Sequence, residues 1–308
     1  MNAKLDIVGD IHGYADELEA LLGKLGYRQQ GGVYRHNAGR QVAFVGDYVD
    51  RGPKIRRVLE IVRGMVDAGT AFAILGNHEV NALRYHTIGS DGKPLRKHSD
   101  KNVEQHAATL AQFADPVEWL AWMQWLAGLP FSLEINGLRV VHAAWDPQGV
   151  REMRTQGRLE GAVLERYSYK MTKEFNTISQ LLNGPEALLP DGLTLPDAEG
   201  NQRPEIRVKW WMSLKGRTCR EAIFPDSPDA PELPLAEAPS SCTEYPKDAP
   251  VTFFGHYALK DPTPQPIKHN LACLDYGVGK DGFLCAYRWD GEQVLETAKF
   301  VCQKDSGS

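Results

Sequence analysis

The sequence contains no long hydrophobic run: none of its apolar segments approaches the roughly 20 residues that a helix needs to cross a bilayer. It also leaves no room for a signal peptide, because Met1 to Lys4 lead directly into an apolar segment with the pattern of a strand. We therefore expect a cytoplasmic protein with no membrane contact.

Closely spaced cysteine pairs are missing too. The chain has five cysteines, an odd number, and no two of them form a Cys-x-x-Cys pair. Zinc knuckles use such pairs and secreted disulfide frameworks use even numbers, so we expect free thiols in a reducing compartment. The five residues are Cys219, Cys242, Cys273, Cys285 and Cys302.

The chain has no excess of positive charge, since its formal net charge is -5. Binding of nucleic acid through bulk electrostatics is therefore not expected. Of the 308 residues, 42% are hydrophobic and 24% are charged, a composition typical of a globular protein with a sizeable core. Internal repeats and low-complexity tracts are absent as well.

Short apolar segments and helical patterns alternate from residue 5 to residue 85. We predict strands at 5–8, 41–45 and 71–75 and helices at 14–25, 54–66 and 80–85. This alternation is typical of a parallel α/β layer, in which ligands bind beyond the carboxyl ends of the strands.

The rest of the chain is less regular. An Asn136-Gly137 turn predicts a hairpin of strands 131–135 and 138–141. Seven prolines from Pro225 to Pro250 require an extended, irregular segment. We predict one domain, 1–308, with a cap inserted at about 146–250. The other predicted elements are helices at 102–113, 116–126 and 205–214, a mostly helical stretch up to about 182, a loop at 183–204, a strand at 251–254 and an antiparallel group at 269–274, 282–289 and 293–298.

Five predicted strand ends carry side chains that can bind metal ions. Gly46-Asp47-Tyr48-Val49-Asp50-Arg51-Gly52 follows the second strand. Alone, each such residue is explained by a turn or by an ordinary buried histidine. Their recurrence at five strand ends instead indicates a metal centre. The ligands expected on this basis are Asp10, His12, Asp47, Asn77, His142 and His256.

The ligand types suit two divalent ions about 3.5–4 Å apart, the spacing used for in-line displacement at phosphorus. Asp10, His12 and Asp47 form one set, and Asp47, Asn77, His142 and His256 form the other. Asp47 is the natural bridge. Mixed nitrogen and oxygen ligands favour manganese, iron or zinc over calcium, and we expect manganese first. A water bridging such ions supplies hydroxide near neutral pH.

Three further residues suit catalysis. His78 follows the expected ligand Asn77 by one residue and suits a general acid that protonates the leaving group. Asp50 is the candidate for the carboxylate that orients His78. Arg51 is the candidate for a bidentate clamp on the phosphoryl oxygens.

The motifs Gly-Asp-Ile-His-Gly, Gly-Asp-Tyr-Val-Asp-Arg-Gly and Gly-Asn-His-Glu, with the later strands ending at His142 and His256, resemble those of the calcineurin-like metallophosphoesterases, and more narrowly the phosphoprotein phosphatase superfamily. The resemblance implies an α/β (α+β) fold, with a central β-sandwich flanked by helices and a dinuclear metal site at its rim. The early strands would form one sheet and the later hairpins the other.

Differences from the family motifs indicate which members of the family the chain resembles more closely. Ala144 stands where the family commonly has glycine after His-Ala, and Leu75 stands where eukaryotic members typically have arginine. The region from Gly255 to Leu259 looks closest to bacterial diadenosine tetraphosphate hydrolases and polynucleotide phosphatases. On that resemblance Asp275 supports the site, and the cap supplies a second phosphate-binding arginine. Its candidates are Arg84, Arg207, Arg217 and Arg220.

The sequence thus predicts a dinuclear metal-dependent phosphatase that acts by in-line attack of a metal-bridging hydroxide. The expected partner is a phosphorylated substrate: a phosphoprotein, a nucleotide or a small phosphoester. A dinucleoside polyphosphate hydrolase is the first alternative. A metal-binding regulator without catalysis is the second, and the pairing of His78 with Asp50 argues against it.

Overall fold

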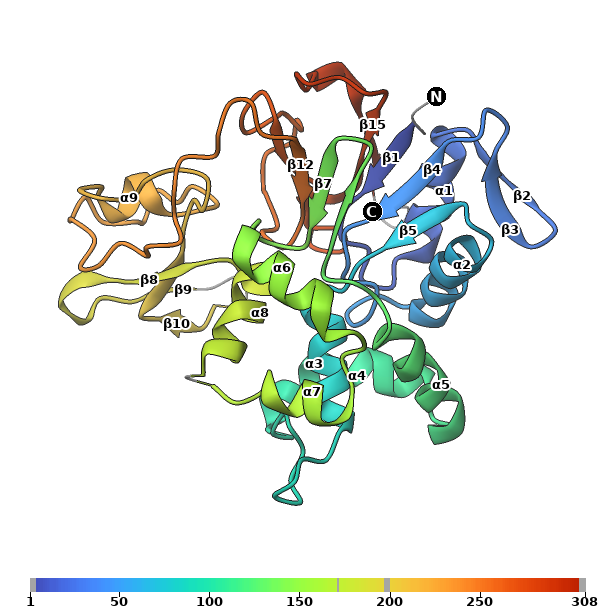
Figure 1. The fold of residues 1–308 in the computed structure, drawn as a ribbon, viewed down its shortest axis with the longest axis horizontal. Helices are drawn as coiled ribbons and strands as arrows, with labels where there is room; N and C mark the ends of the chain where they lie inside the picture. The colour runs from blue at the N-terminus through green and yellow to red at the C-terminus, as the bar shows by residue number, and fades with distance from the viewer. Residues whose placement is uncertain (1–3, 171, 197–199, 305–308) are drawn as a thin grey trace.

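The computed structural model describes residues 4–170, 172–196 and 200–304. Two β-sheets pack face to face at its centre, and helices lie on the outer side of the first sheet (Figure 1). The residues between the sheets come from both of them, for example Ile7 and Ala43 from one and Val140 and Phe253 from the other. This arrangement is the predicted β-sandwich flanked by helices.

The first sheet contains the early parallel strands and the C-terminal strands. Its order is β14-β15-β1-β4-β5, with β16 paired to β15. β1, β4 and β5 are parallel, as predicted, and β15 runs antiparallel to β1. The strands are β1 (Leu5–Val8), β4 (Gln41–Phe44), β5 (Ala71–Ala73), β14 (Asp275–Tyr276), β15 (Phe283–Trp289) and β16 (Phe300–Lys304).

The second sheet has the order β13-β12-β7-β6. β6 and β7 form the hairpin predicted from Asn136-Gly137, and β7, β12 and β13 are parallel. The strands are β6 (Ser132–Ile135), β7 (Leu138–Val141), β12 (Val251–Phe254) and β13 (Leu271–Cys273).

Side-chain alternation explains why both faces of the first sheet are buried. Leu5 and Ile7 of β1 point into the sandwich, and Val8 joins a separate core on the outer face. The buried stripes of α1 and α2 lie in that outer core, including Leu18 and Val58. The helices are α1 (Ala15–Lys24), α2 (Ile55–Asp67), α3 (Asn77–His86), α4 (Asp100–Gln112), α5 (Pro116–Leu126), α6 (Pro147–Gln156), α7 (Gly161–Arg166), α8 (Lys173–Asn183) and α9 (Cys219–Ala222). Among the described residues no helix has the length and apolar character that crossing a membrane requires.

The helix predicted at 205–214 is wrong. Glu205–Arg207 is strand β11, paired with β8 (Glu186–Leu188), and the chain after it is irregular. Ile206, Val208 and Trp210 are buried at every second position, which is the period of a strand. The same pairing places strand β8 in the predicted loop 183–204, which also contains β9 (Leu195–Pro196) and β10 (Gln202–Arg203).

The predicted antiparallel group at 269–298 is also wrong in part. β13 pairs parallel to β12 in the second sheet, and 293–298 forms no strand. The C-terminal strands β14 to β16 instead return to the first sheet, because β15 pairs along the whole of β1. A hairpin of β2 (Tyr27–Gln30) and β3 (Val33–His36) was not predicted.

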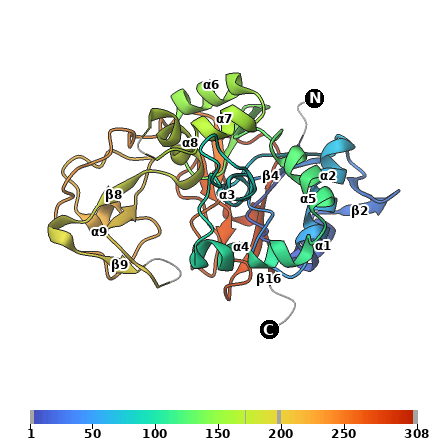
Figure 2. The same cartoon turned by 90° about the horizontal axis from the view of Figure 1, so that it is seen from below.

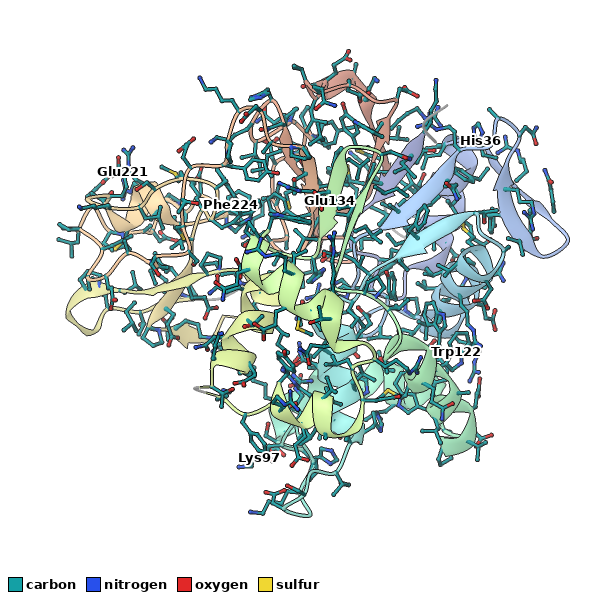
Figure 3. All side chains as sticks on the ribbon, in the orientation of Figure 1. His36, Lys97, Trp122, Glu134, Glu221 and Phe224 are labelled. Carbon is teal, nitrogen blue, oxygen red and sulfur yellow. The ribbon has the colours of Figure 1, made fainter. Side chains whose placement is uncertain are left out.

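Residues 142–250 connect β7 to β12, its neighbour in the second sheet. Within this segment β8 to β10 and α9 lie together to one side of the sandwich in Figures 1 and 2. Phe224 lies between this lobe and the second sheet (Figure 3), with its ring 4.9 Å from that of Tyr257. The seven-proline stretch forms neither helix nor strand, as expected.

A buried charge network fixes the outer end of β1. The carboxylate of Asp6 is fully buried and accepts hydrogen bonds from Arg40 at 2.9 Å and from the Tyr27 hydroxyl at 2.9 Å. Arg40 also donates to the carbonyl oxygens of Leu5 and Trp289. It therefore holds neighbouring strands β1 and β15 together.

We expect Arg40→Ala to lower the free energy of unfolding by about 3 kcal/mol, because the substitution removes the buried cation from the Asp6 carboxylate and leaves only the more exposed Arg288 beside it. Urea denaturation measures the change. Lys4 is a matched control, since its ion pair with Asp290 is 60% exposed on the lysine side and contributes at most about 1 kcal/mol. Equal effects of Arg40→Ala and Lys4→Ala would contradict this account.

Candidate active site

The loops that follow the strands bring the predicted ligands together in backbone conformations that non-glycine residues seldom adopt. Eight described residues other than glycine have a positive φ, and five of these eight are predicted site residues. Such conformations cost free energy and gather at functional sites. The five are His12 (45°), Asp47 (54°), Asp50 (66°), Arg51 (68°) and His256 (74°).

Asp47 lies at the centre of the cluster. Its Oδ1 atom accepts a hydrogen bond from the backbone N–H of His78 at 3.0 Å. The Nε2 atoms of His12 and His142 lie 3.5 Å from its two carboxylate oxygens, one on each. Burial opposes ionisation, but His142 and His78 lower the pKa of Asp47 well below its usual value. A carboxylate between two groups of histidines can bind two cations at once.

Two groups of donor atoms share Asp47. One contains His12, Asp47 and His78, and the other contains Asp47, His142 and His256; within each group the donor atoms lie within 4.8 Å of one another. The amide oxygen of Asn77 lies 2.9 Å from His142 Nε2 and 3.0 Å from His256 Nδ1. The second predicted ligand set is therefore assembled in full.

The first group differs from the predicted set, because it contains His78 in place of Asp10. Asp10 lies beside the second group instead: its Oδ2 atom accepts the backbone N–H of His256 at 3.0 Å. Its other oxygen, Oδ1, is buried and has no hydrogen-bond partner in the described part of the chain. A Cβ on Gly255 would stand 1.9 Å from that oxygen, so only glycine permits the approach.

The unpartnered atoms fit a cation. Burial and the neighbouring Asp275 raise the pKa of Asp10 well above its usual value, and a bound cation would stabilise the ionised carboxylate instead. His256 Nε2 is likewise buried without a partner among the described residues. Burial and the charge of Arg207 lower the pKa of His256, which favours the neutral imidazole that metals require.

Backbone carbonyls orient two of the histidines. His12 Nδ1 lies 3.1 Å from the carbonyl oxygen of Val49, and His142 Nδ1 lies 2.8 Å from that of Val45. When Nδ1 carries the proton, its N–H donates to the carbonyl oxygen and the Nε2 atom on the Asp47 side has a free lone pair. This pairing of a ligand nitrogen with a second hydrogen bond is typical of metal-binding histidines. Burial opposes protonation of His142, but the Asp47 and Asp10 carboxylates raise its pKa to about 10, so a cation there competes with a proton.

His78 and Asp50 form a close pair. His78 Nδ1 lies 2.6 Å from Asp50 Oδ2, and both side chains are buried. His78 Nε2 points the other way, 4.0 Å from Asp47 Oδ2. His78 therefore faces the centre of the cluster while Asp50 holds it from behind.

Arg51 is exposed beside the cluster and makes no hydrogen bond or ion pair with any described residue. Together with burial, its charge lowers the pKa of His12, which places the guanidinium within electrostatic reach of the ligands. A free cation at the edge of a metal centre is suited to an anionic substrate.

Three supporting residues were not predicted. The buried Glu79 carboxylate accepts backbone N–H bonds from Asp47, Tyr48, Val49 and Gly76, at 2.8 to 3.2 Å. His106 and Thr109 of α4 contact the Asp50 carboxylate. Glu79 could have been suspected from its place in Gly-Asn-His-Glu, whereas no local pattern marks the two α4 residues.

We expect Glu79→Ala to lower the free energy of unfolding by about 3 kcal/mol or more, because four buried N–H groups lose their acceptor. Bound metal should fall as well, since these groups hold the loop that carries Asp47. Glu79→Gln keeps one acceptor oxygen and should lose less. Chemical denaturation with metal analysis tests this, and a loss below about 1 kcal/mol for Glu79→Ala contradicts it.

Of the four candidate arginines, Arg207 is the one whose charge affects a predicted ligand, His256. Arg84 donates to the carbonyl oxygen of Tyr167 and to Ser168. Arg217 and Arg220 form ion pairs with Glu221 and Glu232, respectively.

Asp275 accepts the backbone N–H of Ala258 at 2.7 Å and so holds the loop after His256.

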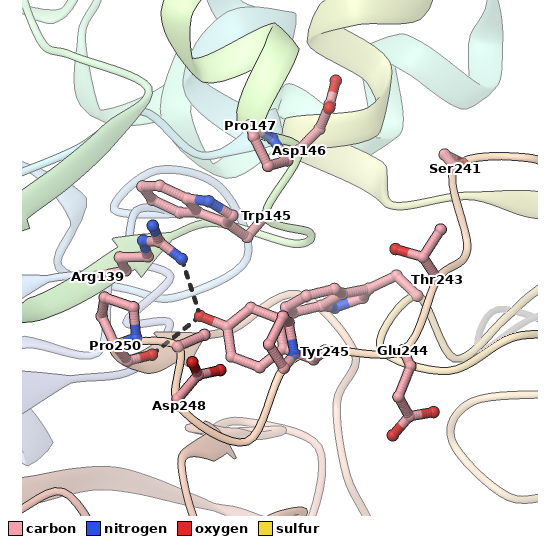
Figure 4. A pocket seen from close by; sticks show the side chains of 13 residues that line it. Arg139, Trp145, Asp146, Pro147, Ser241, Thr243, Glu244, Tyr245, Asp248 and Pro250 are labelled. Atoms are coloured by element: carbon pink, nitrogen blue, oxygen red, sulfur yellow. Dashed lines mark hydrogen bonds between the residues drawn. The ribbon is translucent and has the colours of Figure 1, made fainter.

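A separate cavity of about 410 Å³ lies between β7 and residues 241–250. In Figure 4 the Trp145 ring lies close to the Arg139 guanidinium, and the Tyr245 hydroxyl bonds to both Arg139 and the carbonyl oxygen of Pro250. None of the predicted ligands lines this cavity. It is therefore not the metal centre.

Comparison with known proteins agrees with this geometry. A family model described as calcineurin-like phosphoesterase matches residues 3–256, a span that contains all the predicted ligands. Curated relatives include the asymmetrical bis(5'-nucleosyl)-tetraphosphatase PrpE of Bacillus subtilis, 45% identical over 121 residues (35% of this chain, 50% of the relative). The corresponding protein of Oceanobacillus iheyensis is 43% identical over 95 residues (31% and 37%). The chain thus spans half or less of the length of these relatives.

Solved structures share the fold at low sequence identity. A serine/threonine phosphatase from Saccharomyces cerevisiae aligns with 100% of this chain and 81% of its own, with a TM-score of 0.52 and 13% identity. A cold-active protein tyrosine phosphatase aligns with 94% of this chain and 74% of its own, with a TM-score of 0.50 and 19% identity. With the family model covering most of its length, the chain belongs to the calcineurin-like phosphoesterases.

Proposed function

We propose that this protein is a dinuclear metal-dependent phosphatase. The observation that carries the proposal is the position of Asp47, which belongs to both groups of metal-binding side chains. Two cations that share a carboxylate are the arrangement used for hydrolysis at phosphorus. Such ions, when bound, act as Lewis acids and lower the pKa of water so that hydroxide is available for in-line attack.

The ligands follow from the donor atoms. His12 and Asp47 would hold the first ion. Asp10 is the third ligand predicted for that ion from the sequence, and its unpartnered oxygen is the atom that would bind. Asp47 would also hold the second ion, together with Asn77, His142 and His256. Their neutral imidazoles and carboxylates suit a divalent transition metal.

The remaining residues bind the substrate and move a proton. Arg51 binds the phosphoryl oxygens, because it is exposed at the cluster and has no partner in the described chain. Arg207, whose charge acts on His256, is the second candidate for this task. His78 protonates the leaving oxygen from Nε2, since Nδ1 is bound to Asp50. The Asp50 carboxylate binds Nδ1 and so leaves Nε2 facing the cluster.

Hydrolysis of a dinucleoside polyphosphate is the second candidate, favoured by the name shared by the curated relatives. Such a substrate uses the same metal centre and needs room for a nucleoside. We propose that residues 146–250 form a cap that provides it, within a single domain 1–308. Manganese as the metal and a cytoplasmic location stay predictions from the sequence.

A substrate panel with manganese separates these functions. It should contain p-nitrophenyl phosphate, a phosphoserine peptide, a nucleoside monophosphate and diadenosine tetraphosphate, with bound metal measured in the same preparation. Release of phosphate from the monoesters supports the phosphatase. Cleavage of diadenosine tetraphosphate alone supports the second candidate, and its products show whether cleavage is symmetrical. Two bound metals with no turnover of any substrate would indicate a metal-binding regulator and contradict both.

A further inference from the structure

The Asp50 carboxylate is held from the side opposite His78. Its Oδ1 atom lies 2.6 Å from Nδ1 of His106 and accepts a hydrogen bond from the Thr109 hydroxyl at 2.7 Å. Both residues belong to α4, and both are fully buried. Thr109 also accepts the backbone N–H of Asp50 at 3.0 Å. One helix therefore holds both the Oδ1 atom and the backbone N–H of Asp50.

We propose that His106 and Thr109 are positioning residues for the hydrolysis: they hold Asp50 so that its Oδ2 atom faces His78. The inference rests on the proposed role of His78 as the general acid. Without the contacts on Oδ1, the hydrogen bond to His78 is the one contact with a described residue that restrains the terminal torsion of the Asp50 carboxylate. With these contacts, Oδ1 of Asp50 binds α4 and Oδ2 binds His78.

The donor and acceptor roles of His106 and Asp50 fit this arrangement. Asp50 can accept but not donate, so the proton between it and His106 must be on His106 Nδ1. The Nε2 atom of His106 lies 3.1 Å from Nε2 of His86. If His86 donates there, Nε2 of His106 accepts and its Nδ1–H is the required donor. In this chain of hydrogen bonds His106 directs its donor at Oδ1 of Asp50 and leaves Oδ2 to His78.

The surroundings keep His106 in place. Its ring packs 5.1 Å from that of Tyr85 and 6.1 Å from that of Trp119, so it is held between α3 and α5. His98 also stacks on the Tyr85 ring, with ring centroids 3.8 Å apart, and its hydrogen bond within the described part of the chain goes to the Tyr85 carbonyl oxygen. His98 therefore shares the aromatic environment of His106 without reaching Asp50, which makes it a matched control.

The test compares substrates that differ in their need for a general acid. Activated p-nitrophenyl phosphate has a good leaving group, whereas phenyl phosphate depends more on protonation. We expect His106→Leu to lower kcat on phenyl phosphate by about 10–100-fold, the usual effect of losing a residue that orients a functional group. On p-nitrophenyl phosphate the loss should be less than about threefold. KM and bound metal should not change.

Conservative variants distinguish positioning from folding. His106→Asn keeps a donor near the Nδ1 position and should recover most of kcat on phenyl phosphate, and His98→Leu should match the unmodified protein on both substrates. Thr109→Val, which removes the second contact, should show the same substrate dependence as His106→Leu and provides the test if His106→Leu does not fold. Equal losses on both substrates, or no loss, would overturn the inference.

His78→Ala in the same assays separates this inference from the proposed function. In one outcome His78→Ala alone loses more activity on phenyl phosphate than on p-nitrophenyl phosphate, while His106→Leu and Thr109→Val do not. In that case the positioning role is wrong and the role of His78 as the general acid stands. If His78→Ala shows no dependence on the leaving group, the proposed acid is wrong, and the positioning role is overturned with it.

Discussion

Asp47→Ala is expected to remove metal loading and turnover together. Asp47 is the one carboxylate shared by both groups of donor atoms, so its loss weakens both cation sites at once. Metal ions contribute several kcal/mol of transition-state stabilisation, which corresponds to a loss of about 10³-fold or more in kcat/KM. Elemental analysis of the purified protein and a p-nitrophenyl phosphate assay with manganese measure the two effects.

His142→Ala should give the same paired loss, because His142 Nε2 faces both Asp47 and Asn77. Asp16→Ala is a suitable control, since Asp16 is exposed and pairs with Lys54 on the surface. The account is contradicted if Asp47→Ala keeps its full metal content, or loses metal while kcat/KM stays within about tenfold of the unmodified protein.

His78→Ala is expected to separate turnover from metal binding. The side chain is held by Asp50 at 2.6 Å and points its Nε2 atom toward the cluster. Loss of a general acid lowers the rate by about 10²–10⁴-fold, with the largest effect on substrates whose leaving group is poor. Bound metal should stay at the level of the unmodified protein, because the second ligand set and Asp10 are unchanged.

An alkyl phosphate and an activated aryl phosphate should therefore respond differently to His78→Ala. If His78→Ala hydrolyses the aryl substrate, but not the alkyl substrate, at the rate of the unmodified protein, His78 acts as the acid only for poor leaving groups. A full rate on the alkyl substrate as well removes that role. If bound metal falls by half instead, His78 is a ligand of the first ion, as its grouping with His12 and Asp47 allows.

The convergence of the ligands could be predicted because each follows a short apolar strand. Asp10 and Asp47 end neighbouring parallel strands, so their loops meet at one edge of the first sheet. His142 and His256 end neighbouring strands of the second sheet. The sandwich brings these two edges together. The catalytic roles of His78, Asp50 and Arg51 stay predictions.

The supporting contacts could not be predicted, because they join residues far apart in the chain. Thr109 lies 59 residues from Asp50 and meets it only after α4 packs against the motif loop. Glu79 can be suspected from its place in Gly-Asn-His-Glu, but what it does becomes clear only when the four N–H groups around it are placed. The strand β11 was missed for a different reason: a short apolar stretch with two adjacent tryptophans fits a helix as well as a strand when its pairing partner is unknown.

Crystals grown with manganese, with anomalous diffraction recorded near the manganese edge, test the central claim most directly. The account predicts two peaks about 3.5–4 Å apart on either side of the Asp47 carboxylate. One should contact Asp10 and His12, and the other Asn77, His142 and His256. No peak at Asp47, or manganese bound only elsewhere on the protein, would contradict the account.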